Sequence, residues 1–256
     1  MSLSRVYVIP HGDEIISMPN ENAKKMNRKI REVVKGDPAE TVLIISPHSL
    51  RISSGIPVIN TLYATGEYTI GKKIVSGNYQ INKELNSRIM AKSSHFIEAV
   101  FISTEGKLSN FPLDFGSVIP LSFFEVKKIS LIGQWRSFRP KLLKKLGGLL
   151  YDAVSSAEER ISVVFSADQA HAHSRSGPYG YDPRAKEYDK MIVNSILRND
   201  FSGVVEMSRD FVEGAKPDSY WSMVMFSGFV NKGNLSTAFH FYYLQRYFGM
   251  LLATAE

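Results

Sequence analysis

Three short apolar runs constrain the fold of this chain more than any other feature. The runs RVYVI (5–9), TVLII (41–45) and ISVVF (161–165) have the length and the β-branched composition of buried strands. Between the first two, residues 20–35 carry apolar side chains every three or four positions among lysines and arginines, which is typical of an amphipathic helix. A strand, a helix and a second strand in this order predict a parallel pair.

The rest of the chain continues the alternation of helices and strands. Further helical segments are expected over 82–99, the second part of 110–124, 140–155, from 183 onwards, in short turns over 200–215, and over 219–230. A further strand is expected over 126–132, strands or hairpins at the sheet margin over 52–80, and a final strand or core-covering segment over 239–248. The pattern predicts the α/β class: a single domain over residues 1–256, with a central, largely parallel or mixed twisted sheet flanked by helices on both faces.

Composition excludes several classes of site. Cysteine is absent from the 256 residues, so disulfides, thiolate metal ligands and a cysteine nucleophile are excluded. Lysine and arginine exceed aspartate and glutamate by 31 to 25, an excess that we attribute mainly to solvated helix faces. No arginine-rich or mixed basic and aromatic segment points to nucleic acid, although a positive field would attract an anionic small substrate.

The N-terminal sequence and the hydrophobic runs bear on localisation. The chain begins MSLSRVYVIPHG, which lacks the layout of a signal peptide, and no apolar run approaches the roughly 20 residues that span a bilayer. We expect a cytoplasmic protein with no membrane partner. The aromatic segment 239–248 has a composition suited to an interface between two copies of the chain, so a homodimer is possible.

Histidines follow each of the three predicted strands. His11 follows the first strand in HGD, and His48 follows the second in SPHS. The third strand is followed by SADQAHAH, which contains Asp168, His171 and His173. Because the carboxyl ends of parallel strands meet at one edge of a sheet, these side chains are expected to gather in one crevice.

The residue types in this crevice suit a particular metal chemistry. Two neutral imidazoles and one carboxylate, with open coordination positions, form the facial triad preferred by non-haem Fe(II). Such an iron can hold a bidentate diol and dioxygen together. A further histidine that is not a ligand can move a proton near neutral pH.

The same motifs, followed by GPYGYDPRAKEYD over 177–189, resemble the class III extradiol ring-cleavage dioxygenase family, the LigB-type superfamily. The resemblance spans most of the chain. It implies an oxidoreductase of aromatic catabolism that opens the ring of a catechol-type substrate and inserts both atoms of O2. Its cofactor would be Fe(II), with Zn or Mn as alternatives, and its partners would be a small aromatic diol and O2.

The resemblance also implies roles for individual residues. His11 and His48 become metal ligands and His171 becomes the catalytic histidine. Asp168 would orient the loop or the histidine. For the third ligand Asp218 is preferred, because it falls nearest to the family's acid when the following helices are aligned, and Glu213 is the alternative.

One motif departs from the family. The family carries Asp-His-Gly before its middle helix, whereas this chain has Asp114-Phe115-Gly116. In relatives the missing histidine helps to bind substrate, and His173 is the candidate to take that role here.

Two other functions remain open from the sequence. His171 and His173 could chelate zinc in a hydrolase, with Asp168 bridging or activating water. Alternatively, the chain could be a binding protein of the same fold in which Phe115 marks the loss of chemistry.

Overall fold

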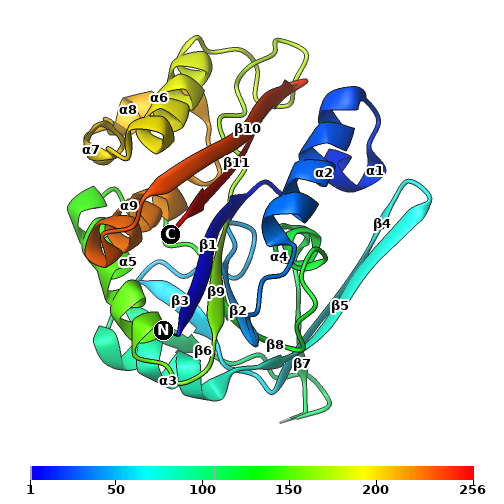
Figure 1. Cartoon of the computed structure of the whole chain (residues 1–256), viewed down its shortest axis with the longest axis vertical. Coiled ribbons are helices and arrows are strands. Elements are labelled where there is room, and N and C mark those ends of the chain that lie inside the picture. The colour runs from blue at the N-terminus through cyan, green and yellow to red at the C-terminus, as the bar shows by residue number, and fades with distance from the viewer. Residues whose placement is uncertain (1, 107) are drawn as a thin grey trace.

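Four parallel strands form the centre of the molecule (Figure 1). The computed structural model describes residues 2–106 and 108–256, and its central strands lie in the order β1 (Leu3–Ile9), β9 (Ile161–Ser166), β2 (Thr41–Ile45) and β8 (Lys128–Ile132). The three apolar runs of the sequence are therefore adjacent, with the third run between the first two. The predicted α/β class is confirmed.

The remaining strands extend this centre at both edges into a mixed, eleven-stranded sheet within the described residues. They are β3 (Ile56–Ile59), β4 (Tyr63–Ile70), β5 (Lys73–Ile81), β6 (Phe96–Ala99), β7 (Asn110–Pro112), β10 (Thr237–Gln245) and β11 (Phe248–Ala255). Strand β11 pairs antiparallel with β1 and β10 with β11, whereas β5 pairs parallel with β8 and continues into β4 and β7. Strands β3 and β6 pair in parallel beside β8.

Helices cover both faces of the sheet. They are α1 (Glu14–Ser17), α2 (Glu21–Val34), α3 (Lys83–Lys92), α4 (Phe115–Leu121), α5 (Pro140–Ser155), α6 (Arg184–Arg198), α7 (Ser202–Val205), α8 (Arg209–Ala215) and α9 (Tyr220–Gly233). Side chains alternate along β1, so that Val6 and Val8 join a core with α3, α5, α6 and α9, whereas Tyr7 and Ile9 join a second core with α1, α2 and α4. Among the described residues, no helix has both the length and the apolar character needed to cross a membrane.

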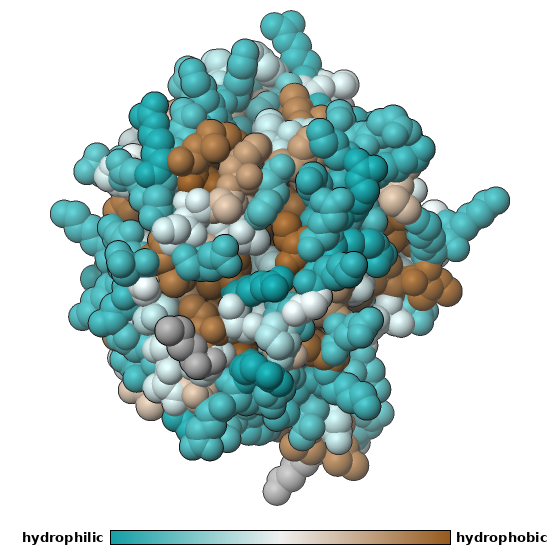
Figure 2. All heavy atoms as spheres, in the orientation of Figure 1, coloured by the Kyte–Doolittle hydropathy of each residue, from teal (hydrophilic) through white to brown (hydrophobic). Residues whose placement is uncertain are grey.

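Helix α9 is buried along most of its length, and its packing fixes the segment that precedes it. A Cβ at Gly228 would lie 1.8 Å from a backbone oxygen of α5, and a Cβ at Gly147 would lie 1.9 Å from a backbone oxygen of α9. The two helices therefore touch through their backbones, which requires glycine at both positions. The outer surface is different in character: Figure 2 shows mostly hydrophilic side chains, with apolar residues visible between them.

Two segments differ from the predicted elements. The helix expected over 82–99 ends at Lys92, and Phe96–Ala99 forms β6, because this edge segment pairs with β3 instead of continuing the helix. The single strand expected over 239–248 is a hairpin of β10 and β11, whose turn places Arg246 at a φ of 44°. The turn lacks the glycine or asparagine that usually marks such a conformation.

Candidate metal centre and active site

The candidate site lies at the carboxyl ends of the central strands. His11 follows β1, His48 follows β2 and Asp168 follows β9, so the parallel order of these strands brings the three loops to one edge. Asp218 reaches the same edge from the segment just before α9. His11, Asp168 and Asp218 are buried.

Three of these side chains converge on one point. His11 Nε2 lies 2.9 Å from Asp218 Oδ2, His48 Nε2 lies 3.0 Å from the same oxygen, and the two Nε2 atoms are 3.1 Å apart. All ligand atoms of the group lie within 4.8 Å of one another. The second carboxylate oxygen, Asp218 Oδ1, is buried and has no hydrogen-bond partner among the described residues. Two nitrogens and a carboxylate with an unused oxygen fit a divalent metal ion.

The surroundings of His11 fix which of its nitrogens faces this point. Ser166 Oγ donates to Gly116 O at 2.5 Å, so it accepts from His11 Nδ1–H at 2.9 Å. The backbone N–H of His11 donates to Asp168 Oδ1 at 3.0 Å. With Nδ1 carrying a proton, the lone pair for a metal is on Nε2, as an imidazole ligand requires. Asp168 thus orients the His11 loop.

The buried ionisable side chains of this site shift one another's pKa values. Burial lowers the pKa of His11, but the charges of Asp168 and Asp218 outweigh it and raise that pKa to about 9. Burial raises the pKa of Asp218, but the His11 charge and the hydrogen bonds from His11 and His48 hold it well below its usual range. The pKa of Asp168 is raised, mainly by burial. A metal ion bound at His11 Nε2 would displace a proton from that nitrogen.

A residue that the sequence analysis missed holds Asp218 in place. Gln134 Nε2 donates to Asp218 O at 2.8 Å and to Ser222 Oγ at 3.1 Å. The hydroxyl of Ser219 donates to the backbone oxygen of Asp168. Gln134 follows β8, the fourth parallel strand, so the positional rule that indicated the histidines could also have indicated this residue.

Phe115 lies where the family resemblance led us to expect a histidine. Its ring centroid is 4.2 Å from that of His48 and 5.7 Å from that of His11. The preceding Asp114 accepts hydrogen bonds from Ser46 Oγ and Ser117 Oγ, both at 2.7 Å, which fix the start of α4. An apolar ring therefore covers one side of the histidine pair.

His171 is close to the convergent group but is not part of it. Its Nδ1–H donates to Gln169 O at 2.8 Å, which leaves Nε2 for a different partner. The ring stacks on Phe248 with a centroid distance of 5.3 Å and an interplanar angle of 12°, and it packs edge to face with Tyr179 at a centroid distance of 5.5 Å. These contacts hold the imidazole without using both of its nitrogens.

His173 has a separate set of partners. Its Nε2 lies 2.8 Å from Asp189 Oδ2, which also accepts from Tyr242 O–H at 2.6 Å, while Asp189 Oδ1 accepts from Ala170 N–H at 2.9 Å. The side chain of His173 is 7% exposed and is not among the residues that line the two cavities described below. His173 is therefore engaged by Asp189 and lines neither cavity, and His171 and His173 have different hydrogen-bond partners.

The two candidate carboxylates, Asp218 and Glu213, have different partners in the structure. Asp218 lies against both His11 and His48, whereas the Glu213 side chain is half exposed and pairs with Arg209 at 2.6 Å. Of the two, Asp218 is the carboxylate that the fold brings to the histidines.

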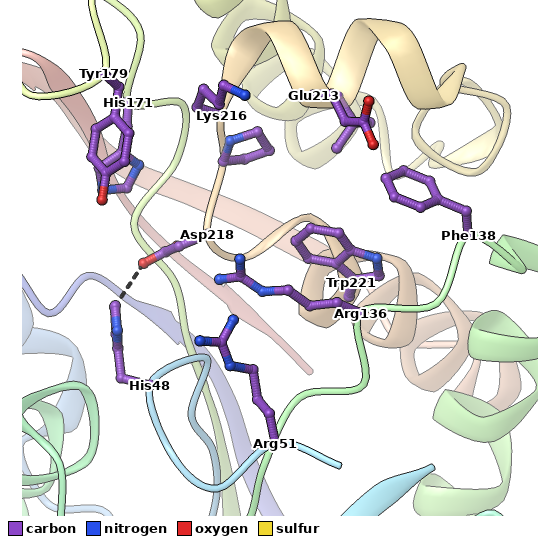
Figure 3. A pocket seen from close by; sticks show the side chains of 12 residues that line it. His48, Arg51, Arg136, Phe138, His171, Tyr179, Glu213, Lys216, Asp218 and Trp221 are labelled. Atoms are coloured by element: carbon purple, nitrogen blue, oxygen red, sulfur yellow. Dashed lines mark hydrogen bonds and ion pairs between the residues drawn. The ribbon is translucent and has the colours of Figure 1, made fainter. Parts of the chain in front are cut away.

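Two cavities of ligand size meet at His48, His171 and Tyr179. The first, of about 520 Å³, is also lined by Arg51, Arg136, Phe138, Lys216 and Trp221 (Figure 3). The second, of about 440 Å³, is also lined by His11, Glu14, Tyr68, Phe115 and Phe248. The convergent side chains thus face a space that could hold a single aromatic ring with substituents.

Comparison with known proteins identifies the family and the fold of the chain. Residues 5–250 match the family described as the catalytic LigB subunit of aromatic ring-opening dioxygenase. Protein CA_C1420 of Clostridium acetobutylicum is 25% identical over 230 residues, which cover 84% of this chain and 49% of that protein, so the chain spans about half the length of this curated relative. The crystal structure of the uncharacterized protein JW3007 from Escherichia coli has the same fold, with a TM-score of 0.66 and 12% sequence identity. The superposition covers 98% of this chain and 99% of the JW3007 chain. The chain belongs to the LigB family of aromatic ring-opening dioxygenase catalytic subunits.

Proposed function

We propose that the protein is a non-haem Fe(II)-dependent extradiol dioxygenase that opens the ring of a catechol-type substrate. The family is one of dioxygenase-type enzymes that generally depend on a metal and act on aromatic substrates with O2. The observation that carries the proposal is the convergence of His11 Nε2, His48 Nε2 and Asp218 Oδ2 at the wall of the cavities. The reaction balances without an external reductant, because both oxygen atoms enter the product and the diol supplies the electrons.

The three side chains would hold the iron with one side open to substrate. A ferrous ion bound there would hold the diol oxygens and O2 together and pass electron density between them. The His11 side chain is 1% exposed and that of His48 is 31% exposed, so the open side is the side of His48 and the cavities. Phe115 covers His48 and would keep water from one flank of the bound ring.

His171 is the residue that we assign to proton transfer. Its Nδ1–H is committed to Gln169 O, so proton exchange with a bound diol would use Nε2. The ring lines both cavities, beside the metal-binding group. Proton transfer by a positioned histidine contributes about 10²–10⁴-fold to the rate.

A second candidate function rests on Phe115. An apolar ring replaces the expected imidazole directly above His48, and this replacement favours a metal-containing binding protein of the same fold that has lost turnover. The zinc hydrolase hypothesis has less support, because His173 is bound to Asp189 and does not share a ligand position with His171.

Oxygen uptake by the metal-loaded protein tests the proposal. Separate samples are loaded with Fe(II), Mn(II) or Zn(II) under anaerobic conditions. Each sample is then mixed with oxygenated buffer and one of a panel of catechols, while oxygen concentration and near-ultraviolet absorbance are recorded. The proposal predicts oxygen consumption with a ring-opened product in the Fe(II) sample and neither in the Zn(II) sample. Iron bound at one site per chain, with no catechol consumed, would favour the binding protein.

A further inference from the structure

The larger cavity carries an excess of positive charge beside the candidate metal centre. Arg51, Arg136 and Lys216 line it, and its two carboxylates are already engaged, since Glu213 pairs with Arg209 and Asp218 with the histidines. An excess of cationic side chains next to a reaction site points to an anionic ligand.

Arg136 is held in position by its neighbours. Its Nε donates to Gln134 Oε1 at 3.2 Å, and its guanidinium carbon lies 4.9 Å from the centre of the Trp221 ring. Gln134 also binds the backbone of Asp218, so Arg136 is fixed relative to the metal-binding group. Stacking on the indole leaves the guanidinium N–H groups at the far end free to bind an anion.

Arg51 and Arg136 line the same cavity, and their side chains lie close to each other. In Figure 3 both guanidinium groups point toward the space in front of Asp218 and His48. Within the described residues neither arginine forms a salt bridge with a carboxylate. Burial, together with the charge of Arg51, lowers the pKa of Arg136, so an anion between the two groups would relieve an existing repulsion.

Under the proposed function, the ligand that carries this anionic group is an aromatic diol. Resting on that function, we propose that Arg51 and Arg136 form a subsite for a carboxylate carried by the aromatic diol, and that this subsite selects ring acids over neutral catechols and catechol amines. Two adjacent guanidinium groups suit the two oxygens of a carboxylate. Trp221 and Phe138 provide an apolar wall for the part of the ligand that carries it.

The subsite also sets the direction in which the substrate lies. The second cavity is lined by the acidic residues Asp13 and Glu14 and by no lysine or arginine of the described chain, so a carboxylate placed there would find no cationic partner. With the acid between Arg51 and Arg136, the ring would lie near His48 and His171, which line both cavities.

The test replaces Arg51, because Arg136 also donates a hydrogen bond to Gln134, which holds Asp218 in place. Arg51→Gln and the charge-retaining Arg51→Lys are compared with Arg28→Gln, a control on α2. The substrates are a dihydroxybenzoate and unsubstituted catechol. Loss of a charge-assisted hydrogen bond predicts that Arg51→Gln lowers kcat/KM for the dihydroxybenzoate about 10–100-fold relative to catechol, mainly through KM. Arg51→Lys is expected to recover part of this loss.

A binding measurement separates this inference from the proposed function. Benzoate, which has no diol, is titrated into the metal-loaded protein while tryptophan fluorescence is followed, because Trp221 lines the subsite. Benzoate binding that weakens in Arg51→Gln, in a protein that opens no catechol, would support the subsite and contradict the proposed function. Ring opening with no preference for the dihydroxybenzoate and no effect of Arg51→Gln would overturn the subsite and leave the proposed function standing.

Discussion

Replacing His171 with alanine separates proton transfer from metal binding. The ligand atoms that lie within 4.8 Å of one another belong to His11, His48 and Asp218, and His171 is not among them. His171→Ala removes the Nε2 that faces the cavities but leaves this group in place. We therefore expect one Fe(II) per chain in the variant, as in the unchanged protein.

The size of the effect follows from the contacts of the ring. Losing a positioned acid and base lowers kcat by about 10²–10⁴-fold, which corresponds to about 3–5 kcal/mol of activation free energy. Loss of the stacking on Phe248 costs about 1 kcal/mol of the free energy of unfolding, or about 2–4 °C in Tm. The catalytic loss should greatly exceed the loss of stability.

The assay combines anaerobic Fe(II) titration, steady-state oxygen uptake and thermal unfolding. His95→Ala is the matched control, because His95 packs near Trp135, with ring centroids 5.5 Å apart, and lines neither cavity. The reasoning is refuted if His171→Ala loses its iron, or if kcat stays within a few-fold of the unchanged value.

Other predictions concern the carboxylate ligand, the helix contact and one buried acid. Asp218→Asn should weaken Fe(II) binding by more than about 100-fold, whereas Glu213→Gln should leave the affinity unchanged in the same titration; the reverse result would exchange their roles. Gly228→Ala should lower the free energy of unfolding by about 1–3 kcal/mol in denaturant, since its Cβ would meet the α5 backbone at 1.8 Å, but Gly148→Ala, whose nearest neighbour is 3.4 Å away, should be neutral or stabilising. Burial raises the pKa of Glu14 from 4.5 to about 7, so the folded state holds the proton more tightly and stability falls as pH rises from about 4.5 to 7. The fall is about 1 kcal/mol after allowance for partial exposure, and Glu14→Gln should remove it; an identical pH profile for the variant would count against this explanation.

The sequence was sufficient to predict the centre of the fold and the positions of the histidines. Each apolar run ended where β-branched residues gave way to a polar loop, and parallel strands bring such loops to one edge. The convergence of His11 and His48, and the place of His171 beside them at the cavities, agree with this rule, whereas His173 does not. The insertion of β9 between β1 and β2 could not be predicted, because strand order depends on tertiary pairing.

Partners distant in the sequence limited the rest of the prediction. The link between His173 and Asp189 forms only when the loop after β9 folds against α6, so the sequence alone could not show that His173 is engaged. Arg51 and Arg136 come from the loops after β2 and β8, and nothing in their local sequences indicates that they share a cavity. The turn at Arg246 was missed because its residues do not favour a left-handed conformation.

The central claim is that His11, His48 and Asp218 bind an iron that supports insertion of both atoms of O2 into an aromatic diol. The most direct measurement is a single turnover of the Fe(II)-loaded protein with isotopically labelled O2 and a dihydroxybenzoate, followed by mass spectrometry of the product. A ring-opened product is expected that carries label in its new carboxylate and, when the aldehyde is reduced before its oxygen exchanges with water, a second labelled oxygen atom; Asp218→Asn should give no such product. Recovery of an intact ring, or a ring-opened product whose new carboxylate carries no label, would contradict the claim.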